Sequence, residues 1–178
     1  MSEAGSESPS HPTVAAMKAG QYNWHLISLA RNCVACPFFM PDSQFHSDWP
    51  FPQRLPLGTG WAGVCTAPGH EGVRPREEEL KSGCNLGYAK TCNRLPSERH
   101  ADAVRFVLGE ERDGIVHVLF VCERAYLPAS HGELLYVKAS GTWLQEHDNA
   151  CVQRMAECYV QAQMERRASC TPNQGEKS

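Results

Sequence analysis

The chain has 178 residues, of which 42% are hydrophobic and 21% charged, with a formal net charge of −3. These values are typical of a soluble globular protein of one domain, and the length is sufficient for a hydrophobic core. The sequence has no block of Lys and Arg and no run of about 18 apolar residues. We therefore expect neither nucleic-acid binding through phosphate contacts nor a membrane span.

The first residues, 1–16, are rich in Ser, Glu, Pro and Ala and contain no apolar core of a secretory signal. We therefore expect a cytoplasmic protein, in which disulfides are disfavoured. Residues 1–20 are predicted to form a disordered tail and residues 168–178 a mobile tail. Residues 21–167 are predicted to form a single domain, with a cysteine-rich lobe over 21–100 and a sheet-plus-helix lobe over 101–167.

The cysteine-rich lobe contains five of the nine cysteines, and these are Cys33, Cys36, Cys65, Cys84 and Cys92. Most of the prolines and glycines of the chain lie in the same stretch, and little of it is periodic. A segment of this composition buries little apolar surface by itself. Several thiolates on one metal centre would hold it together, because the free energy of metal binding then contributes to folding.

Prolines recur throughout residues 37–56, which argues against a helix or a central strand there. The aromatic residues between them are expected to cover the core, or alternatively to keep water away from a metal centre. Residues 58–63 match the pattern G-x-G-x-x-G. A dinucleotide site needs a strand before this pattern and a helix after it. Pro56 and Pro68 make that context improbable, so we expect a chain of turns.

A helix is predicted from Pro75, since proline suits the first helical position and three glutamates follow it. In one unbroken helix, Cys84 and Cys92 would lie about 12 Å apart along the axis. That distance is too long for two ligands of one zinc ion with bonds of about 2.3 Å. Both cysteines can bind one centre only if the helix ends between them, and Gly83 and Gly87 are the expected positions of the break.

The second half of the chain predicts three strands, over residues 103–108, 115–122 and 134–139, with a loop over 126–132 before the third. Thr142 and Gln145 fit a capping box, which predicts a long helix from there to about Arg167. Its apolar face should include Leu144 and Met155. The expected fold is α+β: a small antiparallel sheet packed by a long C-terminal helix, with an irregular cysteine-rich metal-binding N-terminal lobe.

The arrangement of the cysteines bears on the identity of the metal. Structural zinc sites commonly combine two short-spaced cysteine pairs, whereas this chain has one, Cys33-x-x-Cys36. Iron-sulfur clusters are also held by four thiolates, and a Cys-Pro step occurs in ferredoxins. We therefore favour an iron-sulfur cluster, such as 4Fe-4S, over zinc. The preferred ligands are Cys36, Cys65, Cys84 and Cys92, with Cys33 as the spare fifth candidate. His70 leaves open a zinc site of three cysteines and one histidine.

Three functional hypotheses follow. The first is a metal-binding protein whose iron-sulfur cluster has a structural, electron-transfer or sensing role. The second is a zinc-stabilised protein-interaction module, and the third is a thiol oxidoreductase that uses Cys33 and Cys36. Established catalytic motifs are missing from the sequence, so catalytic residues are unknown and enzymatic activity is undecided. A protein partner is conceivable but not indicated by any motif.

Four further residues are expected to be structural. Cys122, Cys151 and Cys158 fall on apolar faces, which is typical of core thiols. His117 lies within an apolar strand and is expected to be a hydrogen-bonded core histidine.

Overall fold

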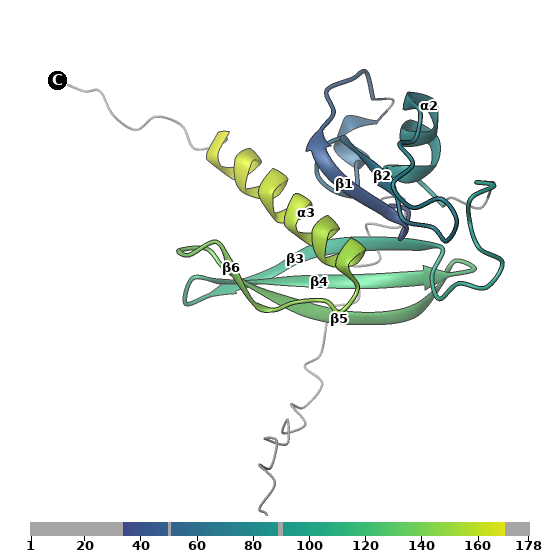
Figure 1. Cartoon of the computed structure of the whole chain (residues 1–178). Helices are drawn as coiled ribbons and strands as arrows, with labels where there is room; N and C mark the ends of the chain where they lie inside the picture. The colour runs from purple at the N-terminus through teal and green to yellow at the C-terminus, as the bar shows by residue number, and fades with distance from the viewer. Residues whose placement is uncertain (1–33, 50, 89–90, 170–178) are drawn as a thin grey trace, which may run out of the picture.

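The structure is a computed structural model that describes residues 34–49, 51–88 and 91–169. Two antiparallel sheets and one long helix are the main elements of this part of the chain (Figure 1). The expectations for Cys33, for the tail over residues 1–20 and for residues 170–178 lie outside the described residues, whereas residues 168–169, also assigned to a mobile tail, are helical. No helix in the described ranges is long and apolar enough to cross a membrane.

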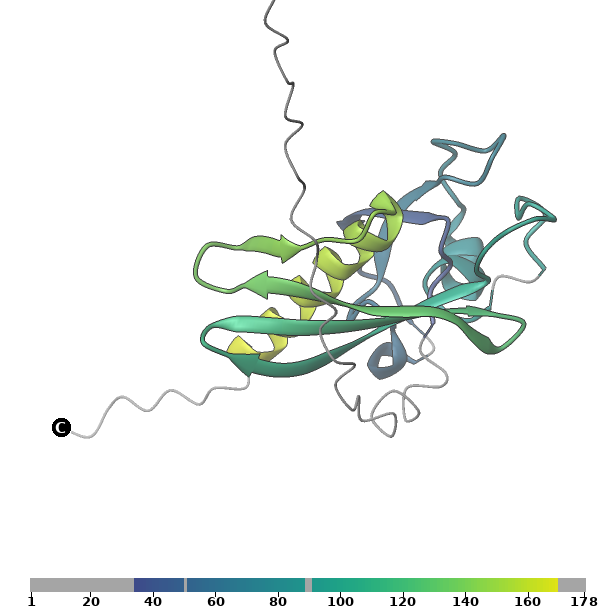
Figure 2. The same cartoon turned by 90° about the horizontal axis from the view of Figure 1, so that it is seen from below.

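The larger sheet has four strands in the order β3-β4-β5-β6. Its strands are β3 (Ala103–Arg112), β4 (Ile115–Arg124), β5 (Leu127–Val137) and β6 (Thr142–Gln145). The smaller sheet pairs β1 (Phe39–Gln44) with β2 (Trp61–Cys65). The helix α3 (Ala150–Ser169) lies across one face of the larger sheet, and the smaller sheet lies on the same side (Figures 1 and 2). The predicted α+β fold, with its antiparallel sheet and long C-terminal helix, agrees with this arrangement.

Tight turns join the first three strands of the larger sheet. Asp113 and Gly114 connect β3 to β4 with φ angles of 52° and 76°, the left-handed values that a two-residue hairpin turn requires. Ala125 and Tyr126 connect β4 to β5 with φ angles of 51° and 66°. Because this second turn returns the chain at once, β5 begins at Leu127. The predicted loop over residues 126–132 is therefore wrong.

The predicted helix start at Thr142 is also wrong. Residues 142–145 form β6, which pairs with β5, and the rings of Trp143 and Tyr136 lie 5.2 Å apart. The helix begins after Asn149, whose side-chain oxygen accepts hydrogen bonds from the backbone N–H groups of Cys151 and Val152 at 2.9 and 3.2 Å. Pairing of residues 142–145 with the edge of β5 therefore prevails over the local preference for a helix start at Thr142. Leu144, which was expected on the apolar face of the helix, is 63% exposed.

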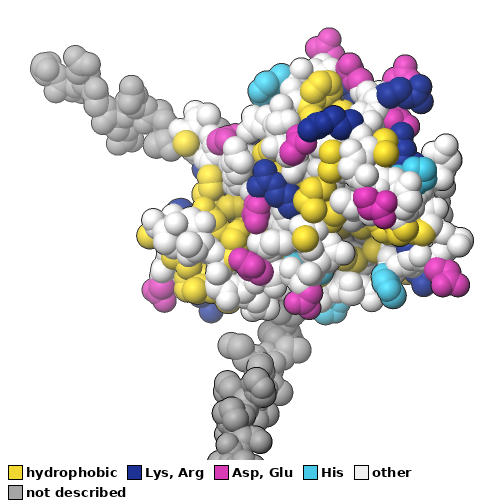
Figure 3. All heavy atoms as spheres, in the orientation of Figure 1, with side chains coloured by type: hydrophobic (Ala, Val, Ile, Leu, Met, Phe, Trp, Pro, Cys, Tyr) yellow, Lys and Arg dark blue, Asp and Glu magenta, His cyan; other side chains and the backbone are white. Residues whose placement is uncertain are grey.

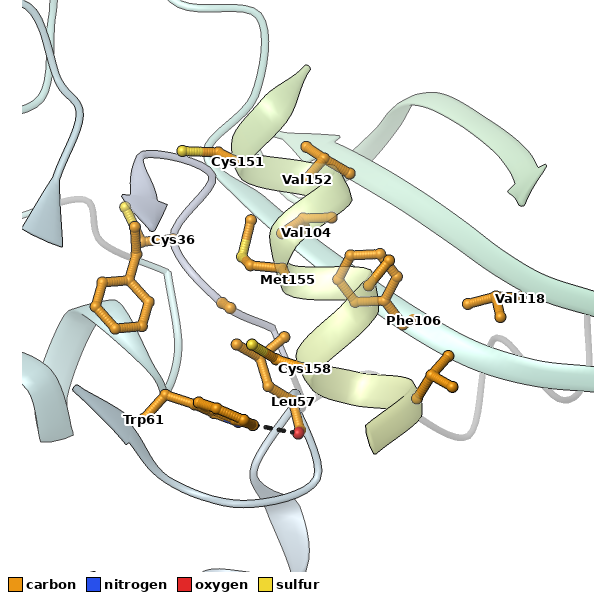
Figure 4. Packing of buried hydrophobic residues seen from close by; sticks show 14 of the residues in the cluster. Cys36, Leu57, Trp61, Val104, Phe106, Val118, Cys151, Val152, Met155 and Cys158 are labelled. Atoms are coloured by element: carbon orange, nitrogen blue, oxygen red, sulfur yellow. Dashed lines mark hydrogen bonds between the residues drawn. The ribbon is translucent and has the colours of Figure 1, made fainter. Parts of the chain in front are cut away.

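One hydrophobic core joins the two lobes. Val104 and Phe106 of β3 and Met155 of α3 belong to the same buried cluster as Leu57 and Trp61 of the N-terminal lobe (Figure 4). The Trp61 indole N–H donates to the carbonyl of Leu57 at 3.3 Å. The bridge between Ala35 and Val104, with backbone hydrogen bonds of 2.8 and 2.9 Å, also ties the lobe to β3. The two lobes therefore share buried apolar contacts.

The N-terminal lobe is less irregular than the sequence indicates. Pro41 lies inside β1, and the register between β1 and β2 shifts between Pro41 and Ser43. Because β1 lies at an edge of a two-stranded sheet, the missing N–H of Pro41 is tolerated there. Residues 58–63 run into the strand β2, whereas the dinucleotide pattern requires a helix. The expectation of turns holds as far as Gly60 and fails from Trp61 onwards.

Gly63 allows β1 and β2 to approach each other closely. A Cβ at this position would lie 2.1 Å from the carbonyl oxygen of Met40, which belongs to the backbone of β1. We expect Gly63→Ala to lower the free energy of unfolding by about 3 kcal/mol, because the clash cannot be relieved by a side-chain rotation. Chemical denaturation measures this change. Ala62→Ser is the control in the same strand, and a loss in Gly63→Ala no larger than in that control would contradict the prediction.

Candidate metal centre

Cys36 and Cys65 are placed at adjacent ends of the small sheet. Cys36 precedes β1 in a turn in which the N–H of Phe39 donates to the Cys36 carbonyl at 3.1 Å. Cys65 is the last residue of β2 and pairs with Phe39 across the sheet. The loop that follows folds back, so that the Cys65 N–H donates to Val73 at 2.8 Å and the Ala67 N–H points to the Cys65 Sγ at 3.5 Å. The pairing of β1 with β2 therefore brings these two thiols together.

Cys84 reaches the same region from a short helical segment. The helix α2 (Glu77–Glu79) continues into a single wide turn, η2 (Leu80–Cys84). The buried side chain of Asn85 then accepts a hydrogen bond from the Trp61 N–H and donates to the Trp61 carbonyl, both at 2.9 Å. The N–H of Cys36 donates to the Cys84 carbonyl at 3.0 Å. These contacts hold the end of the segment against both β2 and the Cys36 turn.

Cys92 returns to Cys84 after the helical segment has ended. The helical turn stops at Cys84, and Gly87 has a left-handed φ of 86°. The expected break between the two cysteines is thus confirmed, with Gly87 as the residue that takes the left-handed conformation. The Leu95 N–H donates to the Cys92 carbonyl at 3.3 Å, which closes a turn at the second cysteine.

These four cysteines line one cavity of about 290 Å³. Its remaining lining includes apolar side chains and a small set of polar ones: Phe38, Phe39, Ala67, Leu95, Glu79, Ser82, Thr91, Asn93 and Arg94. Cys36 and Cys65 are 7% and 9% exposed and form the inner wall. Cys84 and Cys92 are half-buried, and the neighbouring Ser82 and Asn93 are exposed. The cavity therefore has a buried side and a side open to solvent.

The thiols influence one another electrostatically. Burial is the main cause that raises the pKa of Cys36 to about 12; a hydrogen bond from the Phe38 backbone lowers it, and the nearby Cys65, Cys92 and Cys151 make smaller raising contributions. Burial also raises the pKa of Cys84, with further increases from Cys36, Cys92 and Cys65. Both thiols are accordingly protonated at neutral pH. A metal that binds them has to displace their protons, so binding strengthens as the pH rises.

The described part of the chain contains no group of three or more His, Cys, Asp or Glu side chains close enough to hold a single metal ion together. The four cysteines thus surround a space without converging on one point. His70 lies in the loop after Cys65 but is not among the residues that line the cavity.

The residues expected to be structural differ in how well that expectation holds. Cys122 and Cys158 are buried in the core, and burial raises the pKa of Cys158 to about 12. His117 Nδ1 lies 2.6 Å from a Glu133 carboxylate oxygen, as expected of a hydrogen-bonded histidine, but its side chain is 29% exposed and so is not in the core. Cys151 is buried as predicted, but its Sγ lies 3.1 Å from Thr66 Oγ1, next to the cavity wall. Figure 4 shows Cys36 and Cys151 together at one end of the core, with Cys158 nearer Leu57.

Three residues near the cavity carry no signal in the sequence. Cys151 is far from the other cysteines along the chain and falls on an ordinary apolar helix face. Glu79 and Arg94 form an ion pair at the cavity wall with a shortest distance of 2.8 Å, and their sequence separation matches no helical or strand spacing. Only the folded chain identifies them.

The visible surface of the protein carries both signs of charge. Lys and Arg side chains alternate with Asp and Glu over the face shown in Figure 3. The ion pairs of the described residues include Arg74 with Asp42 at 2.8 Å and Lys81 with Glu77 at 2.7 Å. Comparison of the chain with known protein families, with curated proteins and with solved structures finds no match.

Proposed function

We propose that this protein binds an iron-sulfur cluster through Cys36, Cys65, Cys84 and Cys92. The observation that carries the proposal is the meeting of these four thiols, from four separate segments, around one cavity. Four thiolates are the standard ligand set of such clusters. The described cysteines, including these four, are all free thiols, which suits metal binding in a reducing compartment such as the cytoplasm.

The size of the cavity favours a cluster over a single zinc ion. Four sulfurs bound to one zinc at about 2.3 Å lie within about 4 Å of each other and leave no space between them. A volume of about 290 Å³ corresponds instead to several water molecules, each of which occupies about 30 Å³ in the liquid. A cluster of several iron and sulfide ions is larger than one ion, and its thiolate ligands stand farther apart.

The surrounding residues suit a cluster as well. Phe38, Phe39 and Leu95 restrict the access of water from the apolar side of the cavity. The Ala67 N–H points at the Cys65 sulfur, and hydrogen bonds to ligand sulfurs adjust the reduction potential of a cluster. A bound cluster would supply one-electron chemistry. The open side, near Cys84 and Cys92, supports electron transfer or sensing, because both require access from outside, in preference to a purely structural role.

The other two hypotheses receive less support. A zinc-stabilised interaction module would require the four sulfurs to move closer together. A thiol oxidoreductase using Cys33 and Cys36 needs a thiolate nucleophile, whereas burial raises the pKa of Cys36 to about 12. Cys33 lies outside the described residues.

The proposal is tested by metal analysis of the full-length protein purified without oxygen. We expect iron and acid-labile sulfide in equal amounts, at about four of each per chain if the cluster is 4Fe-4S. A broad absorption band near the blue end of the visible spectrum should bleach on reduction with dithionite. Colourless protein with one zinc per chain would overturn the cluster in favour of the zinc module. Metal-free protein with a reactive thiol pair would favour the oxidoreductase.

A further inference from the structure

Arg94 is held in the wall of the cysteine-lined cavity by a two-point contact. Its Nη2 atom donates to both carboxylate oxygens of Glu79, at 2.8 and 3.1 Å. Glu79 is itself fixed, because it accepts a hydrogen bond from the Arg76 N–H at 2.7 Å in the first turn of α2. The Arg94 and Glu79 side chains are only 16% and 27% exposed. The guanidinium is therefore oriented by the helix and partly shielded from water.

The charge of Arg94 acts on the cysteines around the cavity. Arg94 follows Cys92 by two residues and lines the same cavity as all four cysteines. Glu79, which holds the guanidinium, lines the cavity too. The guanidinium therefore borders the same space as the four thiols.

A centre bound by four thiolates carries net negative charge, and it gains one more unit on one-electron reduction. A fixed cation beside it stabilises the reduced state more than the oxidised state. Partial burial of Arg94 strengthens its interaction with the centre, because salt screens buried charges only weakly. The exposed pair of Arg74 and Asp42, with side chains 66% and 37% exposed, lacks this advantage and does not line the cavity.

We propose that Arg94, oriented by Glu79, is the counter-charge of the cysteine-bound centre and raises its reduction potential. This inference rests on the proposed iron-sulfur function. It assigns Arg94 a positioning and electrostatic role, with no contact to a substrate. The side chain favours uptake of an electron without taking part in its transfer.

The test is a redox titration of the loaded full-length protein, followed by visible absorption, for wild type, Arg94→Gln, Arg94→Lys and the control Arg74→Gln. Arg94→Gln removes the charge, and we expect the equilibrium to shift about tenfold towards the oxidised state, or about 59 mV for one electron. Arg94→Lys keeps the charge and should retain most of the wild-type potential. Arg74→Gln should leave the potential unchanged. Iron and sulfide content is measured in every sample.

Each result of the titration either supports or overturns the proposed role of Arg94. A loaded Arg94→Gln protein with the wild-type potential would overturn the counter-charge, and so would an equal shift in Arg74→Gln. If Arg94→Gln loses the cluster, recovery of loading and potential in Arg94→Lys supports the role of charge, and loss in both variants overturns it. Wild-type protein without redox-active iron would overturn the proposed function itself, and this inference with it.

Discussion

Replacing any one of Cys36, Cys65, Cys84 or Cys92 by serine should remove most of the bound metal. All four line one cavity, and each comes from a different segment of the chain. Removal of one thiolate leaves a charged centre short of a ligand, and a serine hydroxyl binds soft metals poorly. The measurement is metal per chain after anaerobic purification, with circular dichroism to follow the fold. We expect each variant to retain less than about a fifth of the wild-type metal.

The matched controls are serine variants of the described cysteines that do not line the cavity, together with Cys33, which lies outside the described residues. Cys122→Ser and Cys158→Ser should keep the metal and lose only about 1 kcal/mol of unfolding free energy. Cys33→Ser should keep it as well. Cys151→Ser is the most demanding control, since its sulfur contacts Thr66 beside the cavity wall. If Cys33→Ser or Cys151→Ser loses its metal while Cys65→Ser keeps all of it, the proposed ligand set is wrong. Full loading in every serine variant of Cys33, Cys36, Cys65, Cys84 and Cys92 would exclude the metal centre.

Removal of the metal should open the segment from Leu80 to Leu95 while the larger sheet and α3 stay folded. Residues 80–95 connect two of the four cysteine-bearing segments and have one side exposed, so their position depends on the centre. Lys81 and Arg94 lie within this segment and provide trypsin sites on either side of Cys84. Chelation without oxygen should accelerate cleavage at these two sites by at least tenfold, because bound metal stabilises only the folded form.

The shared core limits this unfolding. Phe39, Leu57 and Trp61 belong to the buried cluster that includes Met155 of α3, so β1 and β2 retain apolar contacts without metal. Cleavage at Arg154, in α3, is the internal control and should stay slow. Equal protection of Lys81, Arg94 and Arg154 after verified metal removal would contradict the prediction. Equal exposure of all three would show that the whole domain depends on the metal.

Local sequence patterns determined much of the sheet-plus-helix lobe. Alternation in residues 103–108 and the apolar run of 115–122 predicted β3 and β4, because side chains of a strand alternate between two faces. Local patterns failed to predict structure where pairing with a distant strand prevails. Thr142 carries a local capping signal, but the free edge of β5 pairs with it as β6. The prolines of residues 37–56 argued only against a helix or a central strand, and Pro41 lies in β1, at the edge of a two-stranded sheet, where it is tolerated.

The sequence by itself determined which four thiols to consider, that Cys84 and Cys92 need a helix end between them, and that residues 58–63 lack the helix that a dinucleotide pattern requires. Only the tertiary structure decided that the four thiols share a cavity, and that Cys151, Glu79 and Arg94 lie beside it. The physical reason is that helix ends and turns depend on neighbouring residues and steric limits. A cavity instead depends on the register of β1 with β2 and on the packing of distant segments, which local patterns do not encode.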